Sequence, residues 1–263
     1  MTSMKKENSN QSGYQAPAVH KAFQLLRMLS ESEQHLGLTE LALQLGYSKS
    51  TTHGLIHALL REGALVQETN GRKLFLGPTI MDLAFSTWNP MKITEYAQPF
   101  INAIRNQIRE TVFLGALLRK RVLIMAAAEA DEPLKISASP GTAISLFAGA
   151  AAKIFMAGKP DEEIKSLIRE KGLPQYTSRS IITEKEYLAE IERVRSQGYA
   201  FDDEEYLAGI RAVAVPLKNR TGPPVAVWVV GLSSTMSLKK MQQAVEIAAG
   251  SIAQLRQLLD DQH

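Results

Sequence analysis

The chain has 263 residues, a length typical of about two domains that each bury a core of their own. Its formal net charge of +3 allows nucleic-acid binding without requiring it, because the excess of basic residues is small and spread along the chain. The absence of cysteine excludes disulfides and thiolate chemistry. No apolar run is long enough to cross a bilayer and no hydrophobic signal core follows the first lysines, so we expect a cytoplasmic protein without a membrane partner.

The first stretch, 1–16, is polar and poor in apolar side chains. Burial there cannot offset the entropy lost on ordering, so we predict a disordered tail. A helix is predicted over 19–30. Its inner stripe is expected to consist of Ala22, Phe23, Leu25, Leu26 and Leu29.

Two short helices separated by a tight turn are predicted next. Leucines recur at helical spacing over 38–45, and Gly46 follows where a glycine often ends a helix in the left-handed conformation. Ser48 stands where an N-cap residue is expected, so a second helix is predicted over 49–62. One face of this second helix is apolar, and the opposite face carries short polar and histidine side chains.

A β-hairpin is predicted after these helices, with strands over 65–69 and 72–76 joined by Asn70-Gly71, a pair that favours two-residue turns. This order of elements is the layout of a winged helix-turn-helix domain, which we assign to 17–78. A plain scaffold with the same elements is the alternative. The side chains predicted to contact DNA are Lys49, Ser50, Thr51, His53, His57, Arg61, Arg72 and Lys73.

The rest of the chain predicts a linker helix within 79–92, broken before Pro90, and a mixed domain over 93–263. Helices are predicted over 93–109, 145–156, 161–169, 183–197 and 238–259. Strands are predicted over 111–118, 121–129, 134–138, 210–217 and 224–232. Because the strands group apart from the helices, we expect an α+β domain.

Two motifs carry a resemblance to a known family. The first is Leu38-Thr39-Glu40-Leu41-Ala42, followed by Gly46-Tyr47-Ser48-Lys49-Ser50-Thr51-Thr52-His53. The second is Gly198-Tyr199-Ala200-Phe201-Asp202-Asp203-Glu204-Glu205-Tyr206, followed by Gly209-Ile210-Arg211-Ala212-Val213-Ala214-Val215-Pro216. Both resemble the IclR family of bacterial transcriptional regulators. The resemblance implies an N-terminal winged helix-turn-helix, a helical linker that makes dimer contacts, and a C-terminal GAF-like effector-binding domain with an antiparallel sheet flanked by helices.

The helix predicted over 49–62 corresponds to the recognition helix of the family. One of its positions departs from the family pattern. Members commonly carry an arginine after its histidine, where this chain has Gly54. An arginine can bond guanine bidentately, which is worth about 1–3 kcal/mol of discrimination. We therefore expect other side chains to read the bases, namely Ser50, Thr51, His53 and His57, while phosphates are held by Lys49, Arg72 and Lys73.

The small residues of 148–152 leave room for a ligand beside a helix N-terminus, where anions are favoured, although they suit tight packing on a sheet equally well. The resemblance implies an effector pocket lined by Ala150, Ala151, Asp202, Ile210, Ala212, Trp228 and Val230. Members that bind small oxoacids have short hydroxyl side chains where this chain has Trp228 and Val230. We therefore expect a small organic acid with an aromatic or otherwise apolar body.

The run 202–205 consists of acidic residues, which could form a metal site or an acid-base pair but more often form a solvated turn or a helix N-terminus. We expect a solvated turn or a helix N-terminus. No histidine lies between His57 and His263, so the C-terminal domain lacks the usual general base and the preferred zinc ligand. We predict no catalytic residue, no metal and no cofactor.

Together these features predict a ligand-responsive regulator rather than an enzyme. It is expected to bind a pseudo-palindromic operator in double-stranded DNA as a homodimer or a dimer of dimers, with repression favoured over activation. Two alternatives stay open at this point. One is an enzyme tethered to a partner by its N-terminal domain, and the other is a sensor or scaffold that uses the winged helix for protein contacts.

Overall fold

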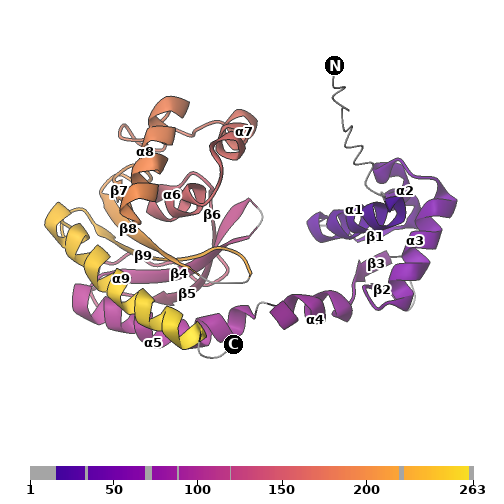
Figure 1. The fold of residues 1–263 in the computed structure, drawn as a ribbon, viewed down its shortest axis with the longest axis horizontal. Coiled ribbons are helices and arrows are strands. Elements are labelled where there is room, and N and C mark those ends of the chain that lie inside the picture. The colour runs from indigo at the N-terminus through magenta and orange to yellow at the C-terminus, as the bar shows by residue number, and fades with distance from the viewer. Residues whose placement is uncertain are drawn as a thin grey trace, which may run out of the picture. The chain divides into compact units, whose positions relative to one another are not determined.

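The computed structural model describes residues 16–32, 35–68, 73–87, 89–118, 120–218 and 222–260. These residues form two compact units that divide between Ser86 and Thr87, and Figure 1 labels their helices and strands. The predicted disordered tail lies outside the described residues except for Ala16. Asn70-Gly71, the predicted hairpin turn, and Arg72 also lie outside them.

The first unit combines short helices with a small sheet. Its elements, with the helix that reaches the division, are α1 (Pro17–Glu31), β1 (Leu36–Gly37), α2 (Leu38–Leu45), α3 (Lys49–Arg61), β2 (Leu65–Gln67), β3 (Lys73–Leu76) and α4 (Pro78–Thr87). The strands run antiparallel in the order β1-β3-β2. Both predicted hairpin strands are thus confirmed, whereas β1 was not predicted because two residues are too few to show a strand period.

The core of the first unit joins all three of its leading helices to the sheet. Leu25 of α1, Leu41 of α2 and Ile56 of α3 pack with Leu65 of β2. The prediction that Phe23 belongs to this core is wrong, because its side chain is 57% exposed. Two residues correspond to a rotation of about 200° around a helix, which turns Phe23 away from the side of Leu25.

The second unit is built on one larger antiparallel sheet. Its elements are α5 (Pro90–Ile108), β4 (Thr111–Leu118), β5 (Arg121–Ala128), β6 (Ala143–Ile144), α6 (Gly149–Ala157), α7 (Asp161–Lys171), α8 (Glu184–Gln197), β7 (Ala200–Asp203), β8 (Ile210–Leu217), β9 (Val225–Leu232) and α9 (Leu238–Asp260). The strand order is β6-β5-β4-β9-β8-β7. The predicted α+β class is confirmed.

Helices cover both faces of this sheet. Figure 1 shows α5 and α9 along one face and α6 and α8 over the other, and a separate apolar core fills each of the two spaces. The central strands β4 and β9 are therefore buried on both faces, which explains why their sequences are almost continuously apolar.

The predicted strand over 134–138 is wrong. This segment is a loop that follows Pro133, and the Thr111 hydroxyl donates to the Ile136 carbonyl at 2.7 Å. The edge strand that pairs with β5 is instead the short β6. Apolar residues between two prolines were thus mistaken for a strand.

The break at Pro90 starts a helix as well as ending one. The Asn89 side chain accepts the Met91 amide at 3.0 Å and the Lys92 amide at 3.2 Å, so α5 begins at Pro90 rather than at Ile93 as predicted. The helix predicted from Ser145 begins only at Gly149.

Candidate nucleic-acid interface and ligand site

The start of α3 is held in place by local hydrogen bonds. The Ser48 hydroxyl accepts the Thr51 amide at 3.1 Å as an N-cap, and Gly46, with φ of 68°, lets the chain leave α2 in the left-handed conformation. Thr52 and Ile56 are buried in the first unit. The opposite face of α3 is therefore presented to solvent.

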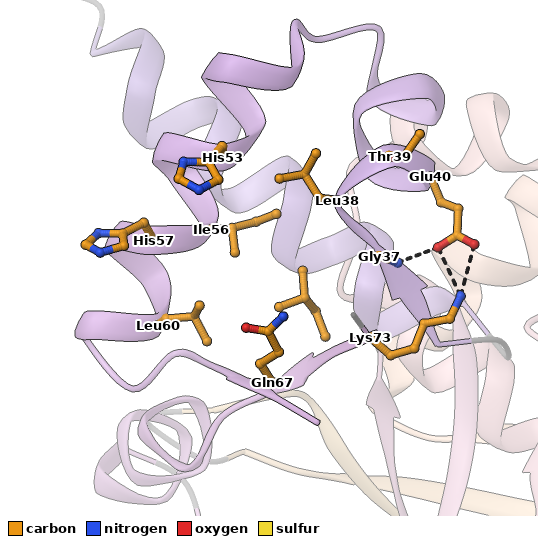
Figure 2. A pocket seen from close by; sticks show the side chains of 11 residues that line it. Gly37, Leu38, Thr39, Glu40, His53, Ile56, His57, Leu60, Gln67 and Lys73 are labelled. Atoms are coloured by element: carbon orange, nitrogen blue, oxygen red, sulfur yellow. Dashed lines mark hydrogen bonds and ion pairs between the residues drawn. The ribbon is translucent and has the colours of Figure 1, made fainter. Parts of the chain in front are cut away.

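Most side chains predicted to contact DNA lie on that exposed face. The exposed ones on α3 are Lys49, Ser50, His53, His57 and Arg61. Figure 2 shows the imidazoles of His53 and His57 one turn apart on the same side of the helix. The Ser50 and Thr51 hydroxyls lie 3.0 and 2.9 Å from the Ser48 hydroxyl, so they gather at the helix N-terminus, where free amides favour an anion.

A groove of about 680 Å³ lies between α3, the start of α2 and the small sheet. Its apolar lining consists of Leu38, Ile56, Leu60 and Leu74. Its polar lining side chains are Thr39, Glu40, His53, His57, Gln67 and Lys73. The groove therefore brings both histidines together with a strand residue predicted to bind phosphate.

Lys73 is bound to a carboxylate of the protein itself. Its Nζ lies 2.9 Å from Oε1 and 3.1 Å from Oε2 of Glu40, and Oε2 also accepts the Gly37 amide (Figure 2). The hydrogen bond from the Gly37 amide and, second, the bond from Lys73 hold the pKa of Glu40 below its usual range, so this carboxylate stays charged. Sequence reasoning had assigned Lys73 to phosphate and had not anticipated this partner.

Gly54 lies on the exposed side of α3, and a Cβ placed there would meet no atom within 4 Å. Packing of the described residues therefore does not require a glycine. The position at which the resemblance implied an arginine is thus open in this chain.

The residues predicted for the effector pocket meet on the sheet face that α6 covers. Asp202, Ala212 and Val230 are direct partners across β7, β8 and β9, so their side chains point to the same side. Trp228, which is paired with Ala214, lies two residues along β9 on that same side. The apolar core on this face contains Ala150, Ala151, Ala212, Trp228 and Val230, and Ile210 packs against it.

Trp228 forms an aromatic wall of this region. A Cβ at Gly115 would lie 2.6 Å from the Trp228 ring and 2.4 Å from the Leu123 carbonyl oxygen, so only glycine fits beneath the indole. The Phe113 ring lies 5.7 Å away, centroid to centroid. The wall is therefore apolar and tightly supported.

Asp202 was expected in a solvated turn or at a helix N-terminus, but it lies in strand β7 and is only 3% exposed. One carboxylate oxygen accepts the Glu205 amide at 2.7 Å and the Tyr206 amide at 3.3 Å. The other faces Gly149 at the start of α6, where a Cβ would lie 2.7 Å away. Burial raises the pKa of Asp202 to about 6, so a proton can be exchanged there near neutral pH.

The neighbouring acids each have their own partner. Asp203 binds Arg211 at 2.6 Å, and Glu204 accepts the Gly209 amide at 2.9 Å. Among the residues that the structure describes, no group of three or more histidine, aspartate or glutamate side chains is arranged to hold a metal ion. Within the same residues, no helix is long and apolar enough to cross a membrane.

Lys153 forms a buried charge network that the sequence analysis missed. Its ammonium donates to Glu190 at 2.8 Å, to Glu205 at 2.7 Å and to the Phe201 carbonyl at 2.8 Å, and its side chain is 4% exposed. The network ties α6 to α8 and to the turn after β7. A lysine inside the otherwise apolar helix α6 was the signal that could have revealed it.

Two protein-family matches together cover most of this chain. Residues 18–69 match the family described as IclR helix-turn-helix domain, and residues 85–255 match the family described as Bacterial transcriptional regulator IclR C-terminal. The HTH-type transcriptional regulator BhcR of Paracoccus denitrificans is 28% identical over 240 residues, covering 90% of this chain and 86% of that protein. The Acetate operon repressor of Salmonella typhimurium is 27% identical over 214 residues, covering 81% of this chain and 78% of that protein.

A solved structure shares both sequence and fold with this chain. An IclR transcriptional regulator from Alicyclobacillus acidocaldarius is 28% identical, with a TM-score of 0.59, and the match covers 92% of this chain and 98% of that one.

Proposed function

The chain belongs to the IclR family of bacterial transcriptional regulators. We propose that it binds a pseudo-palindromic DNA operator as a dimer, and that a small organic acid changes its affinity for this operator. As a member of this family it is a DNA-binding regulator and not an enzyme. Cytoplasmic action and repression are part of the proposal, and the naming of a similar protein as a repressor supports the latter.

The exposed polar face of α3 is the observation that carries the DNA proposal. In it, residues 17–78 form the DNA-binding domain, and α3 enters the major groove. Ser50, Thr51, His53 and His57 read base edges, while Lys49, Arg72 and Lys73 hold phosphates. Arg61 is a further DNA contact in the proposal. The two histidines are suited to this because both are exposed and share one side of the helix.

The test of base reading is a double variant, His53→Ala with His57→Ala, measured against operator and scrambled duplexes. The selectivity between the two duplexes is expected to fall by about 10- to 100-fold, since one good base contact is worth about 1–3 kcal/mol. Lys49→Ala is the matched control, because loss of a phosphate contact weakens both duplexes alike. Unchanged selectivity in the histidine variant would remove both residues from the readout.

Dimerisation is assigned to the linker region, 79–92. Helix α4 has no buried residue among those whose side chains are described, and Met81, Leu83 and Phe85 are exposed. Apolar side chains exposed together on one helix favour a partner surface. Leu83→Glu is expected to shift the protein from dimer to monomer in sedimentation, whereas the control Asp82→Asn leaves the dimer intact. A dimer of dimers through residues 93–263 is the further assembly we propose.

The effector site is assigned to the α6 face of the sheet. Trp228, Val230 and the alanines supply apolar surface, which suits an aromatic or apolar ligand body, and Asp202 supplies a polar end. A protonated Asp202 can donate a hydrogen bond to a ligand carboxylate, so such acids should bind more tightly as the pH falls towards about 6. Calorimetry with aromatic acids and small oxoacids tests this, and binding by small oxoacids alone would reject it.

The ligand can change DNA affinity only if it favours one arrangement of the dimer over another. We assign the connection to α5, which begins within the linker region and packs against the sheet. Solution scattering with and without effector is expected to show a changed separation of the DNA-binding domains. An unchanged separation together with altered DNA affinity would refute this route.

A further inference from the structure

The groove beside α3 contains a fixed negative charge at a place where DNA binding requires positive ones. Of the groove-lining residues that the structure describes, Lys73 is the one lysine or arginine, and Glu40 binds it. The pair therefore leaves this part of the groove with no net positive charge. A carboxylate in this position opposes the approach of a phosphate backbone.

We propose that Glu40 competes with the DNA backbone for Lys73. Glu40 binds Lys73 in the free protein and releases it to a phosphate when operator DNA enters the groove. The inference rests on the proposed DNA binding and adds the residue that limits it. The Lys73 and Glu40 side chains are 41% and 48% exposed, and ion pairs this exposed are weak enough for a phosphate to replace.

Glu40 keeps its place even after the lysine has left. Its carboxylate also accepts the Gly37 amide, and it lies in the first turn of α2, where a negative charge is favoured. Gly37 has no side chain to accept an amide of the first turn, so the bond from the Gly37 amide to Glu40 is the capping-box contact that α2 retains. The charge therefore stays in the groove and weakens binding to every duplex.

This repulsion lowers the affinity for every duplex and leaves the affinity ratio between operator and other duplexes unchanged. Its cost is the same for all sequences, since it acts on the backbone. Glu40 thus restrains binding to non-operator DNA as well as to the operator.

The test is Glu40→Gln, which removes the charge but keeps an oxygen that can accept the Gly37 amide. Affinity for a non-operator duplex is expected to rise about two- to fivefold. The plot of log affinity against log salt should steepen by about 0.9, because the charge of Lys73 beside the phosphates is then no longer offset by Glu40. Adding Lys73→Gln to this variant should abolish both gains. Glu246→Gln, an equal change in net charge at an exposed position of the second unit, is the control and should alter neither quantity.

The proposal would be overturned if a folded Glu40→Gln protein had the same DNA affinity and the same salt slope as the unaltered protein. A gain in affinity that survives the addition of Lys73→Gln would also overturn it. If the variant does not fold, the Glu40 carboxyl pKa can be followed by carbon NMR in the unaltered protein. Its pKa should rise when DNA is added, and an unchanged value would contradict the exchange. Failure of the unaltered protein to bind any duplex at low salt would instead refute the proposed function itself.

Discussion

Replacement of Asp202 by asparagine is expected to stabilise the second unit, and to do so more at neutral than at acidic pH. The buried carboxylate accepts two amides through one oxygen, and an asparagine carbonyl can accept the same two. Asparagine removes the charge that burial disfavours. Asp203→Asn, on the same strand but half-buried and paired with arginines, is the matched control.

The magnitude follows from the pKa. Burial raises it from 3.8 to about 6, so the folded state holds the proton more tightly than the unfolded chain. Each pKa unit corresponds to about 1.4 kcal/mol, so ionising Asp202 costs the native state about 3 kcal/mol at high pH. The cost grows as the pH rises through the interval between the two pKa values and is absent below both. About 2 kcal/mol of it develops between about pH 4.5 and about pH 7.5.

The assay is urea unfolding at these two pH values, followed by fluorescence in a Trp88→Phe background, where Trp228 is the single tryptophan of the chain. The gain in unfolding free energy of Asp202→Asn over its parent should be about 2 kcal/mol larger at the higher pH. Asp203→Asn should show no gain that grows with pH. A stability difference for Asp202→Asn that is constant with pH would refute the argument that burial governs this carboxylate.

Three further substitutions test other parts of the structure. Lys153→Met is expected to cost about 3–5 kcal/mol in urea unfolding, since it removes the buried ammonium that Glu190 and Glu205 share, and recovery of stability when these two carboxylates are neutralised is the check. Gly54→Ala should raise the melting temperature of the first unit through a gain of about 1 kcal/mol, because the site is open and alanine favours helix, and an unchanged melting temperature would argue against this. Gly231→Val should lower the unfolding free energy by about 1–3 kcal/mol, since a Cβ there would lie 2.3 Å from the buried Glu110 carboxylate, and wild-type stability would show that the carboxylate can move.

The sequence was most informative where structure depends on neighbouring residues. Gly46 and Ser48 predicted the turn and the start of α3, because glycine in the left-handed conformation and a serine N-cap act within one helical turn. Thr183 likewise predicted the start of α8, where its hydroxyl accepts the Glu186 amide at 3.3 Å.

The sequence was least informative where structure depends on distant partners. The burial of Asp202 results from β7 joining the edge of the sheet and from α6 packing above it, and four consecutive acids give no local sign of either. Lys153 meets Glu190 across 37 positions, and Lys73 meets Glu40 across 33. Local periodicity cannot show such pairs, since it reports only which face of an element is apolar.

In the proposed function, this chain binds a specific operator through α3, and an organic acid changes its affinity for that operator. Nuclease protection of the DNA upstream of its own gene, repeated with aromatic and aliphatic acids, tests this most directly. We predict a protected pseudo-palindrome whose occupancy changes with one acid of apolar body. Absence of protection at low salt, with and without every acid, would contradict the account.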